Sequence, residues 1–318
     1  MKKGWLLLFL ILCCIAATAP VTAQENGIQF SLTEGVDSAE VKSAIESNVS
    51  RLLTEMNAAQ KDERPLNLCA MGMNEQAMQS LMMLWNNGPF VCLDDEVVER
   101  CITTSSGYQV RNIPLLLRPK DDKNAEYQNA VICFDKAGSI DNFYFAIPDS
   151  LFSKDIRYRF DLTDSCSQFM LDYVEQYLTA YYKKDIQFLS QLFNREGGVF
   201  IGKGKKKKNG DVSLSYTKQS REEFINNLGR VFKRDYPIKM KVNEICVWRS
   251  VADPKCYGVS LHHGWTCRRY KDSGYFFLLW DFNVGLPPML HIVAWQPDMI
   301  KGKPLPVEQV FSLNNFDS

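Results

Sequence analysis

The sequence has little of the material that metal centres and nucleophilic active sites need. It contains three histidines in 318 residues, and none lies in the first half of the chain. No C-x-x-C pair, no Cys/His zinc spacing, no glycine-rich phosphate loop and no Ser-His-Asp signature is present. These absences argue against a zinc domain, a nucleotide-dependent enzyme and a triad hydrolase, and we expect neither a metal nor a cofactor.

The chain also lacks an excess of charge of either sign. It has 37 basic and 37 acidic residues, for a formal net charge of zero. Without a basic field, we do not expect binding to nucleic acid or to an anionic membrane surface. The run GKGKKKKNGD at residues 202–211 is the local exception. It could bind an anionic polymer, but a solvated loop is the commoner explanation of such a run.

Long apolar runs are confined to the N-terminus. Residues 1–23 combine Lys2 and Lys3, an apolar segment over residues 5–17 and the small-residue order Val-Thr-Ala. This pattern is typical of a secretory signal peptide that is cleaved after Ala23. We therefore expect an exported protein that is periplasmic or associated with the cell envelope. No later stretch reaches the ~18 apolar residues that a membrane span requires.

The cysteines leave two questions open. Cys13 and Cys14 would suit a lipoprotein, but the residues before them lack the small side chain that a lipobox needs. Eight cysteines remain in the mature chain: Cys69, Cys92, Cys101, Cys133, Cys166, Cys246, Cys256 and Cys267. Export would allow them to pair. Cys133 and Cys246, however, lie in apolar strand patterns where a thiol packs as a small hydrophobe, and spacing does not decide the connectivity.

Hydrophobic periodicity predicts the same order of elements twice. Helices are predicted at residues 38–60, 74–86, 168–182, 186–193 and 221–232. Strands are predicted at residues 90–93, 97–103, 108–117, 127–134, 140–147, 199–202, 238–251, 258–270, 275–282 and 289–295. Helices followed by antiparallel strands make an α+β plan. We therefore expect two domains, at residues 24–152 and 153–318.

The most apolar part of the mature chain is DSGYFFLLWDFNVGLPPMLHIVAWQP, residues 272–297. Two predicted strands, 275–282 and 289–295, flank a turn that contains one glycine and two prolines. The first strand is apolar on both faces, which indicates a sheet that is covered on both sides. We expect helices on one face and a second protein surface on the other.

The second half resembles a known superfamily. The segment QFMLDYVEQYLTAYYKKDIQFLSQLF, followed by strands that close on LLWDF and HIVAWQP, is similar to nuclear-transport-factor-2-like (SnoaL-like, cystatin-like cone) domains over residues 161–297. Residues 38–148 resemble a more divergent copy. The tandem arrangement resembles exported proteins of Bacteroides-like bacteria. The resemblance implies two cone-shaped domains, each with a curved antiparallel sheet wrapped around N-terminal helices. Its members include ketosteroid-isomerase-like and dehydratase enzymes as well as non-catalytic binding domains, so the fold alone does not choose an activity.

Candidate acid–base residues lie in the second half. His262 and His263 are neighbours on one predicted strand, so they face opposite ways and at most one enters the cone. A catalytic cone would use Asp281 with one of these histidines, because such enzymes commonly pair a carboxylate with a second titratable group. In the alternative, Asp281 has only a structural role at a strand end, where it is solvated or caps the following turn.

Aromatic residues are the candidate ligand-binding set. Tyr177, Trp248, Trp265, Trp280 and Trp295 could line a pocket for a small apolar or sugar ligand. The same side chains could equally be core or interface aromatics.

The leading hypothesis is a non-catalytic exported protein that binds or scaffolds, with a small molecule or an envelope protein as its partner. The alternative is a small-molecule isomerase or lyase that uses the second cone. Because helices fill only the concave side of a cone, the two convex sheets are expected to pack together as an intrachain pseudo-dimer. Trp280 or Trp295 is expected near that seam.

Overall fold

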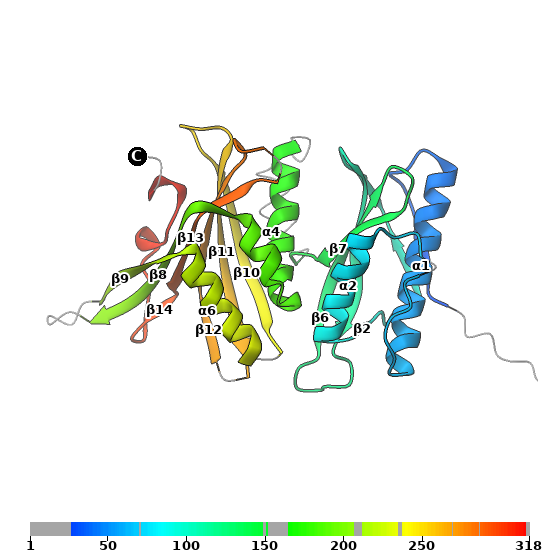
Figure 1. Cartoon of the computed structure of the whole chain (residues 1–318), viewed down its shortest axis with the longest axis horizontal. Coiled ribbons are helices and arrows are strands. Elements are labelled where there is room, and N and C mark those ends of the chain that lie inside the picture. Colours follow the sequence, from blue (N-terminus) through cyan, green and yellow to red (C-terminus); the bar gives the residue numbers. More distant parts are fainter. Residues whose placement is uncertain are drawn as a thin grey trace, which may run out of the picture.

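The computed structural model describes residues 27–69, 71–148, 151, 165–206, 212–234, 237–268, 270–285 and 287–315 (Figure 1). The expected signal peptide and the expected domain boundary near residue 152 lie outside these ranges. The chain is mixed α+β, with two main sheets, helices beside each of them and two short strand pairs (Figure 1). Within the described ranges, no helix combines the length and apolar character that a membrane crossing needs.

Two helices open the first half, and each begins at the cap that its sequence offers. Helix α1 (Ala39–Lys61) starts where Ser38 accepts a hydrogen bond from the backbone N–H of Val41. Helix α2 (Glu75–Asn87) starts where Asn74 accepts from Ala77 in the same way. Both helices confirm the sequence prediction to within a residue. Along α1 the buried residues recur at three- and four-residue steps: Ile45, Asn48, Val49, Leu52, Leu53, Met56 and Ala59.

The first sheet is a small antiparallel meander. Its strands run in the order β2-β5-β6-β7, with β4 also paired to β5. The strands are β2 (Phe90–Val91), β4 (Cys101–Thr103), β5 (Gly107–Leu117), β6 (Glu126–Asp135) and β7 (Ile140–Phe145). A separate parallel pair joins β1 (Gln29–Leu32) to β3 (Glu96–Glu99).

The second half places three helices against a larger sheet. The helices are α4 (Ser165–Lys183), α5 (Ile186–Leu192) and α6 (Arg221–Arg234). The strands are β8 (Phe193–Lys206), β9 (Val212–Ser220), β10 (Lys239–Arg249), β11 (Cys256–Cys267), β12 (Tyr270–Asp281) and β13 (Met289–Pro297). Their order is β10-β11-β12-β13-β8-β9, in which β13 and β8 run parallel and every other pair is antiparallel. The last long strand therefore returns to the centre of the sheet beside the first one.

The two sheets thus differ in strand order. The first is a meander, whereas the second inserts its last long strand between β12 and β8. No helix lies between strands of the first sheet, whereas α6 lies between β9 and β10 of the second. The structure does not show two copies of one plan.

The face of the second sheet that points away from the helices is covered by the C-terminal tail. The tail comprises β14 (Met299–Ile300), β15 (Lys303–Pro304), η2 (Val307–Gln309) and η3 (Leu313–Asn315). Leu313 packs with Phe277 and Ala294, and Phe311 packs beside them. Gly258 allows this close approach, since a Cβ there would lie 3.0 Å from the ring of Phe277 and 3.2 Å from Leu313. Both faces of β12 are therefore covered, as its sequence predicts.

The two halves meet through a helix rather than through their sheets. Helix α4 packs against β7 and α2 of the first half (Figure 1). On its other side, Tyr177 of α4 contacts Phe276 of the second sheet. The expected packing of two convex sheets is therefore not what the structure has. The physical reason is that the tail already covers the apolar outer face of the second sheet.

Five of the described cysteines form no disulfide: Cys69, Cys92, Cys101, Cys133 and Cys267. The side chain of Cys166 lies outside the described set. Among the residues that the structure describes, no group of three or more histidine, cysteine or acidic side chains is placed to hold a metal ion.

Candidate functional site

A cavity of about 330 Å³ lies between the second sheet and its helices. Its wall is largely aromatic and is built by Tyr177, Tyr181, Phe224, Trp265, Phe276 and Trp295. Helix α4 supplies two of these side chains, α6 one, and strands β11, β12 and β13 one each. A concave, mostly apolar hollow with few polar groups has the character of a small-molecule site.

Local spacing explains why these side chains converge. Tyr177 and Tyr181 are four residues apart on α4, as are Phe224 and Leu228 on α6, so each pair lies on one helix face. The hydroxyl groups of Tyr177 and Tyr181 are 2.7 Å apart, and both side chains are buried. Burial raises the pKa of both phenols, so the pair remains protonated at neutral pH.

His263 is the most unusual polar group in the wall. The side chain is 5% exposed, and neither ring nitrogen has a hydrogen-bond partner among the described residues. Its ring meets that of Phe276 edge-on, with centroids 5.2 Å apart. Burial lowers the pKa of His263 to about 4, so the imidazole is neutral at physiological pH. It therefore keeps one N–H donor and one nitrogen acceptor for a molecule in the cavity.

The remaining polar groups of the cavity come from the start of β12. Asp272 and Ser273 belong to the lining, together with Tyr270. The hydroxyl of Tyr270 donates to Oδ2 of Asp272, and Tyr270 is 54% exposed. Asp272 is thus held by a neighbour on the exposed side of the cavity. Polar groups therefore form only a small part of the lining, which is mostly aromatic.

The aromatic residues singled out from the sequence divide into three groups. Tyr177, Trp265 and Trp295 line the cavity. Trp248 packs on the opposite face of the sheet, with the cluster that the tail covers. Trp280 is fully buried in the core, with its ring 5.9 Å from that of Tyr173, and neither Trp280 nor Trp295 lies at a junction between two sheets.

The structure brings Asp281 together with neither His262 nor His263. His262 faces away from the cavity, with Nε2 3.0 Å from Oδ2 of Asp298. Asp281 lies at the end of β12, 3.0 Å from Nε2 of His291, and accepts from the backbone N–H of Asn283. Gly274 is the strand partner of His263. Asp281 is seven residues further along β12, which is about 23 Å in an extended strand. No acid–base pair of Asp281 with His263 exists in this arrangement.

Sequence reasoning did not assign Tyr181, Phe224 and Phe276 to the ligand site. The i, i+4 spacing from Tyr177 could have indicated Tyr181, and alternation along β12 could have placed Phe276 on one face. Phe224 lies 41 residues before its wall partner Trp265, and no local pattern joins the two.

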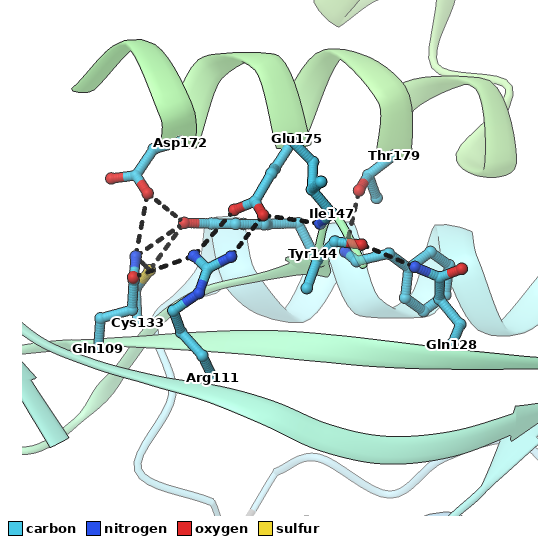
Figure 2. Close-up of polar contacts among 11 residues, drawn as sticks. Gln109, Arg111, Gln128, Cys133, Tyr144, Ile147, Asp172, Glu175 and Thr179 are labelled. Carbon is cyan, nitrogen blue, oxygen red and sulfur yellow. Dashed lines mark hydrogen bonds and ion pairs between the residues drawn. The ribbon is translucent and has the colours of Figure 1, made fainter. Parts of the chain in front are cut away.

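A second polar site lies where α4 meets the first sheet (Figure 2). Arg111 on β5 forms a two-pronged ion pair with Glu175 on α4, with nitrogen–oxygen distances of 2.5 and 3.0 Å. Glu175 also accepts from the backbone N–H of Ile147 at 2.7 Å. Both charged side chains are buried, at 7% and 0% exposure. Each charge is satisfied by the other half of the chain.

Beside this ion pair, Asp172 collects two further hydrogen bonds (Figure 2). The hydroxyl of Tyr144 donates to it at 2.8 Å, and the amide of Gln109 donates at 3.0 Å. Burial, and secondarily the charge of Glu175, raise the pKa of Asp172 to about 6. One turn beyond Glu175, Thr179 accepts from the backbone N–H of Phe145 at 2.9 Å. These contacts hold the two halves together through a single stripe of α4.

Comparison with known proteins gives likeness of fold at low coverage. No family model matches the chain, and no curated protein matches it. Similar solved structures include an NTF-2-like protein of unknown function from Silicibacter pomeroyi, with 15% identity over 41% of this chain and 93% of that one, at a TM-score of 0.28. ActVI-ORFA from Streptomyces coelicolor shares 7% identity over 42% of this chain and 98% of that one, at a TM-score of 0.31.

A Bdellovibrio bacteriovorus protein shares 11% identity at a TM-score of 0.32, and the match covers 41% of this chain and 40% of that protein. The chain therefore matches about two fifths of that protein's length. Likeness at this level indicates no activity.

Proposed function

We propose that this chain is an exported binding protein of the cell envelope that holds a small, largely apolar molecule in the cavity of its second half. Residues 153–318 form the binding domain in this proposal, and residues 24–152 form a supporting domain fixed to α4. The ligand is a compact ring compound with one polar group. The rings of Tyr177, Trp265 and Trp295 would contact the apolar part of the ligand, and His263 would form a hydrogen bond with its polar group.

The observation that carries this proposal is His263. A buried imidazole with two unpaired nitrogens costs stability on the order of 1–3 kcal/mol for each unmet hydrogen bond, so the fold retains an unfavourable group in its apolar cavity. A ligand that accepts from or donates to this ring would recover that cost on binding. A cavity of about 330 Å³ lies at the small end of ligand sites, which favours one or two fused rings over a long chain.

The protonation states of the side chains in the cavity wall favour binding without turnover. The neutral imidazole and the two raised-pKa phenols are matched to hydrogen bonding at neutral pH, not to exchanging a proton near pH 7. Asp272 is the carboxylate of the lining, and it is already bonded to Tyr270.

One observation favours a second candidate, a small-molecule isomerase or lyase. The Tyr177–Tyr181 hydroxyl pair lines the same cavity as His263, and a phenol donor beside a neutral imidazole could stabilise an enolate while the imidazole takes a proton. This isomerase or lyase mechanism would use neither Asp281 nor His262, and it would need no metal.

Fluorescence titration of residues 24–318 tests the proposal, because Trp265 and Trp295 lie in the wall. The probes are uncharged one- and two-ring compounds that carry one hydroxyl or carbonyl group. We expect saturable quenching, and a Tm that rises with ligand concentration because the ligand binds only the folded state. Leu228→Trp, which fills the cavity from α6, should weaken binding at least ten-fold.

Trp248→Phe is the matched control, since Trp248 packs on the opposite face and its loss should leave affinity unchanged. Binding that survives Leu228→Trp but falls with Trp248→Phe would move the site to the tail-covered face and contradict the proposal. Substrate conversion that is lost in both Tyr181→Phe and His263→Gln would instead establish the isomerase or lyase.

A further inference from the structure

A different pocket, of about 350 Å³, lies where α2, α4 and α5 converge. Amide side chains dominate its lining: Gln76, Gln79, Asn142, Gln176, Gln187 and Gln191. Lys183, the last residue of α4, and Ser80 of α2 lie in the same wall. The pocket shares no residue with the aromatic cavity, so its chemistry is independent of the function proposed above.

Lys183 is held by a hydroxyl group rather than by a carboxylate. Its Nζ donates to Oγ of Ser80, and among the described residues no acidic side chain forms an ion pair with it. Burial lowers the pKa of Lys183 to about 8, and the charge of Asp185 opposes this only in part. An amine in such surroundings has a large neutral fraction near physiological pH.

The backbone around Lys183 is fixed from both halves of the chain. The side-chain amide of Asn87, at the end of α2, donates to the carbonyl oxygens of Met83 and Lys183 at 2.9 and 2.8 Å. Helix α4 ends at Lys183, and the next residue, Lys184, has a φ of 57°. Asp185 caps α5 by accepting from Phe188 at 2.8 Å. The amine therefore leaves a rigid helix end toward the pocket.

We propose that Lys183 is a nucleophilic amine that captures a small polar aldehyde or keto acid in this pocket as an imine. The lone pair of neutral Nζ forms a bond to the carbonyl carbon, and the carbonyl oxygen takes a proton to give a carbinolamine. Loss of that oxygen as water leaves the C=N bond, so one water is released and nothing is oxidised or reduced. Ser80, in contact with Nζ, is placed to pass a proton from nitrogen to oxygen.

The lining indicates the polarity of the captured molecule. Amide groups offer both donors and acceptors, which suits a carbonyl compound that also carries hydroxyl or carboxylate oxygens. Phe188 and Ile186 are the chief apolar members of the wall. An extended apolar aldehyde would find little surface to bury here, in contrast to the aromatic cavity.

Reductive trapping tests the proposal on residues 24–318 without any substitution. The protein is incubated at pH 7.5 with glyoxylate and cyanoborohydride, and each lysine is followed by peptide mass mapping. About a quarter of an amine with a pKa near 8 is neutral at pH 7.5, against about 0.1% for an ordinary lysine. We therefore expect Lys183 to be carboxymethylated at least ten-fold faster than the exposed Lys136 and Lys271, with a rate that levels off above about pH 8.

Two variants separate reactivity from mere accessibility. Ser80→Ala should slow capture and move the midpoint of the pH–rate profile, whereas a structural role for Ser80 would leave the profile of Lys183 in place. Lys183→Arg should abolish the fast-labelled peptide, and Lys136→Arg should leave it intact. Labelling of Lys183 at the rate of surface lysines, or a pH–rate midpoint near 10, would overturn the proposal.

Discussion

Glu175 on α4 accepts from both terminal nitrogens of Arg111 on β5, 64 residues earlier in the chain, in a fully buried ion pair (Figure 2). This pair ties the halves at a point where neither charge meets bulk water. Breaking one side of such a pair leaves an uncompensated buried charge, which is far more costly than the pair itself.

We expect Arg111→Met to lower the free energy of unfolding by about 3–5 kcal/mol. The double variant Arg111→Met/Glu175→Gln should lose less than Arg111→Met alone, because it removes both charges. Arg64→Met is the control, since Arg64 pairs with Glu55 at the surface with 36% exposure and should cost less than about 1 kcal/mol. Urea unfolding measures all three. A double variant less stable than Arg111→Met alone would show that the unpaired charge is not the source of the loss.

Asp172 gives the stability a defined pH dependence. Its pKa is about 6 in the folded chain, against about 3.9 when unfolded. The folded state therefore holds the proton more tightly, so the contribution of Asp172 is fully present below pH ~4 and is lost as pH rises through ~6. This difference of about two in pKa corresponds to roughly 2–3 kcal/mol in the free energy of unfolding. Asp172→Asn should remove this slope from the wild-type curve between pH 4 and 7 in urea titrations. An unchanged slope would mean that Asp172 titrates normally.

His263 should be a site where stability and function oppose each other. His263→Phe removes two unpaired nitrogens and adds an apolar ring to an apolar wall. We expect the ligand-free protein to gain about 1 kcal/mol, or a rise in Tm of about 2–4 °C, while ligand affinity falls. Thermal melts with and without ligand measure both effects. A marked destabilisation by His263→Phe would indicate that the imidazole has a structural partner.

The C-terminal tail should keep the chain monomeric. Gln296, 1% exposed, donates to the carbonyl of Gln309 at 2.6 Å and accepts from the backbone N–H of Phe311 at 2.8 Å. Removal of residues 306–318 would expose these groups and the apolar surface around Phe277. We expect dimers or aggregates in light scattering, whereas removal of residues 316–318 alone should leave a monomer. A monomeric and equally stable chain without residues 306–318 would contradict this role.

The two faces of α4 show how far the sequence could lead. Its apolar spacing predicts a helix, and Tyr177 and Tyr181 on one face indicate packing against the sheet. Asp172, Glu175 and Thr179 lie at steps of three and four on another face. This polar stripe is ordinary for a solvated helix. Only the tertiary structure shows that Arg111 and Tyr144, distant in sequence, bury it.

The second sheet likewise shows what the sequence could and could not predict. Apolar residues on both faces of β12 correctly predict cover on both sides, but not what supplies it. Helices cover one face, and the tail covers the other through Phe311 and Leu313, which follow the sheet without any strand or helix periodicity. Strand alternation requires His262 and His263 to face opposite ways, but does not say which one enters the cavity. Asp281 takes the strand-end position that its place before the Gly/Pro turn allows, bonded to Asn283.

Nitrogen NMR of residues 24–318 with ¹⁵N-labelled histidine tests the central claim most directly. The chain has three histidines, so substitution of each assigns all the ring signals. His263 should remain neutral from pH 5 to 8, given a pKa of about 4. A ring compound that quenches the tryptophans should shift only the His263 ring nitrogens, as a hydrogen bond forms. A His263 signal that titrates between pH 5 and 8, or that stays unmoved by a bound ligand while His262 shifts, would contradict the account.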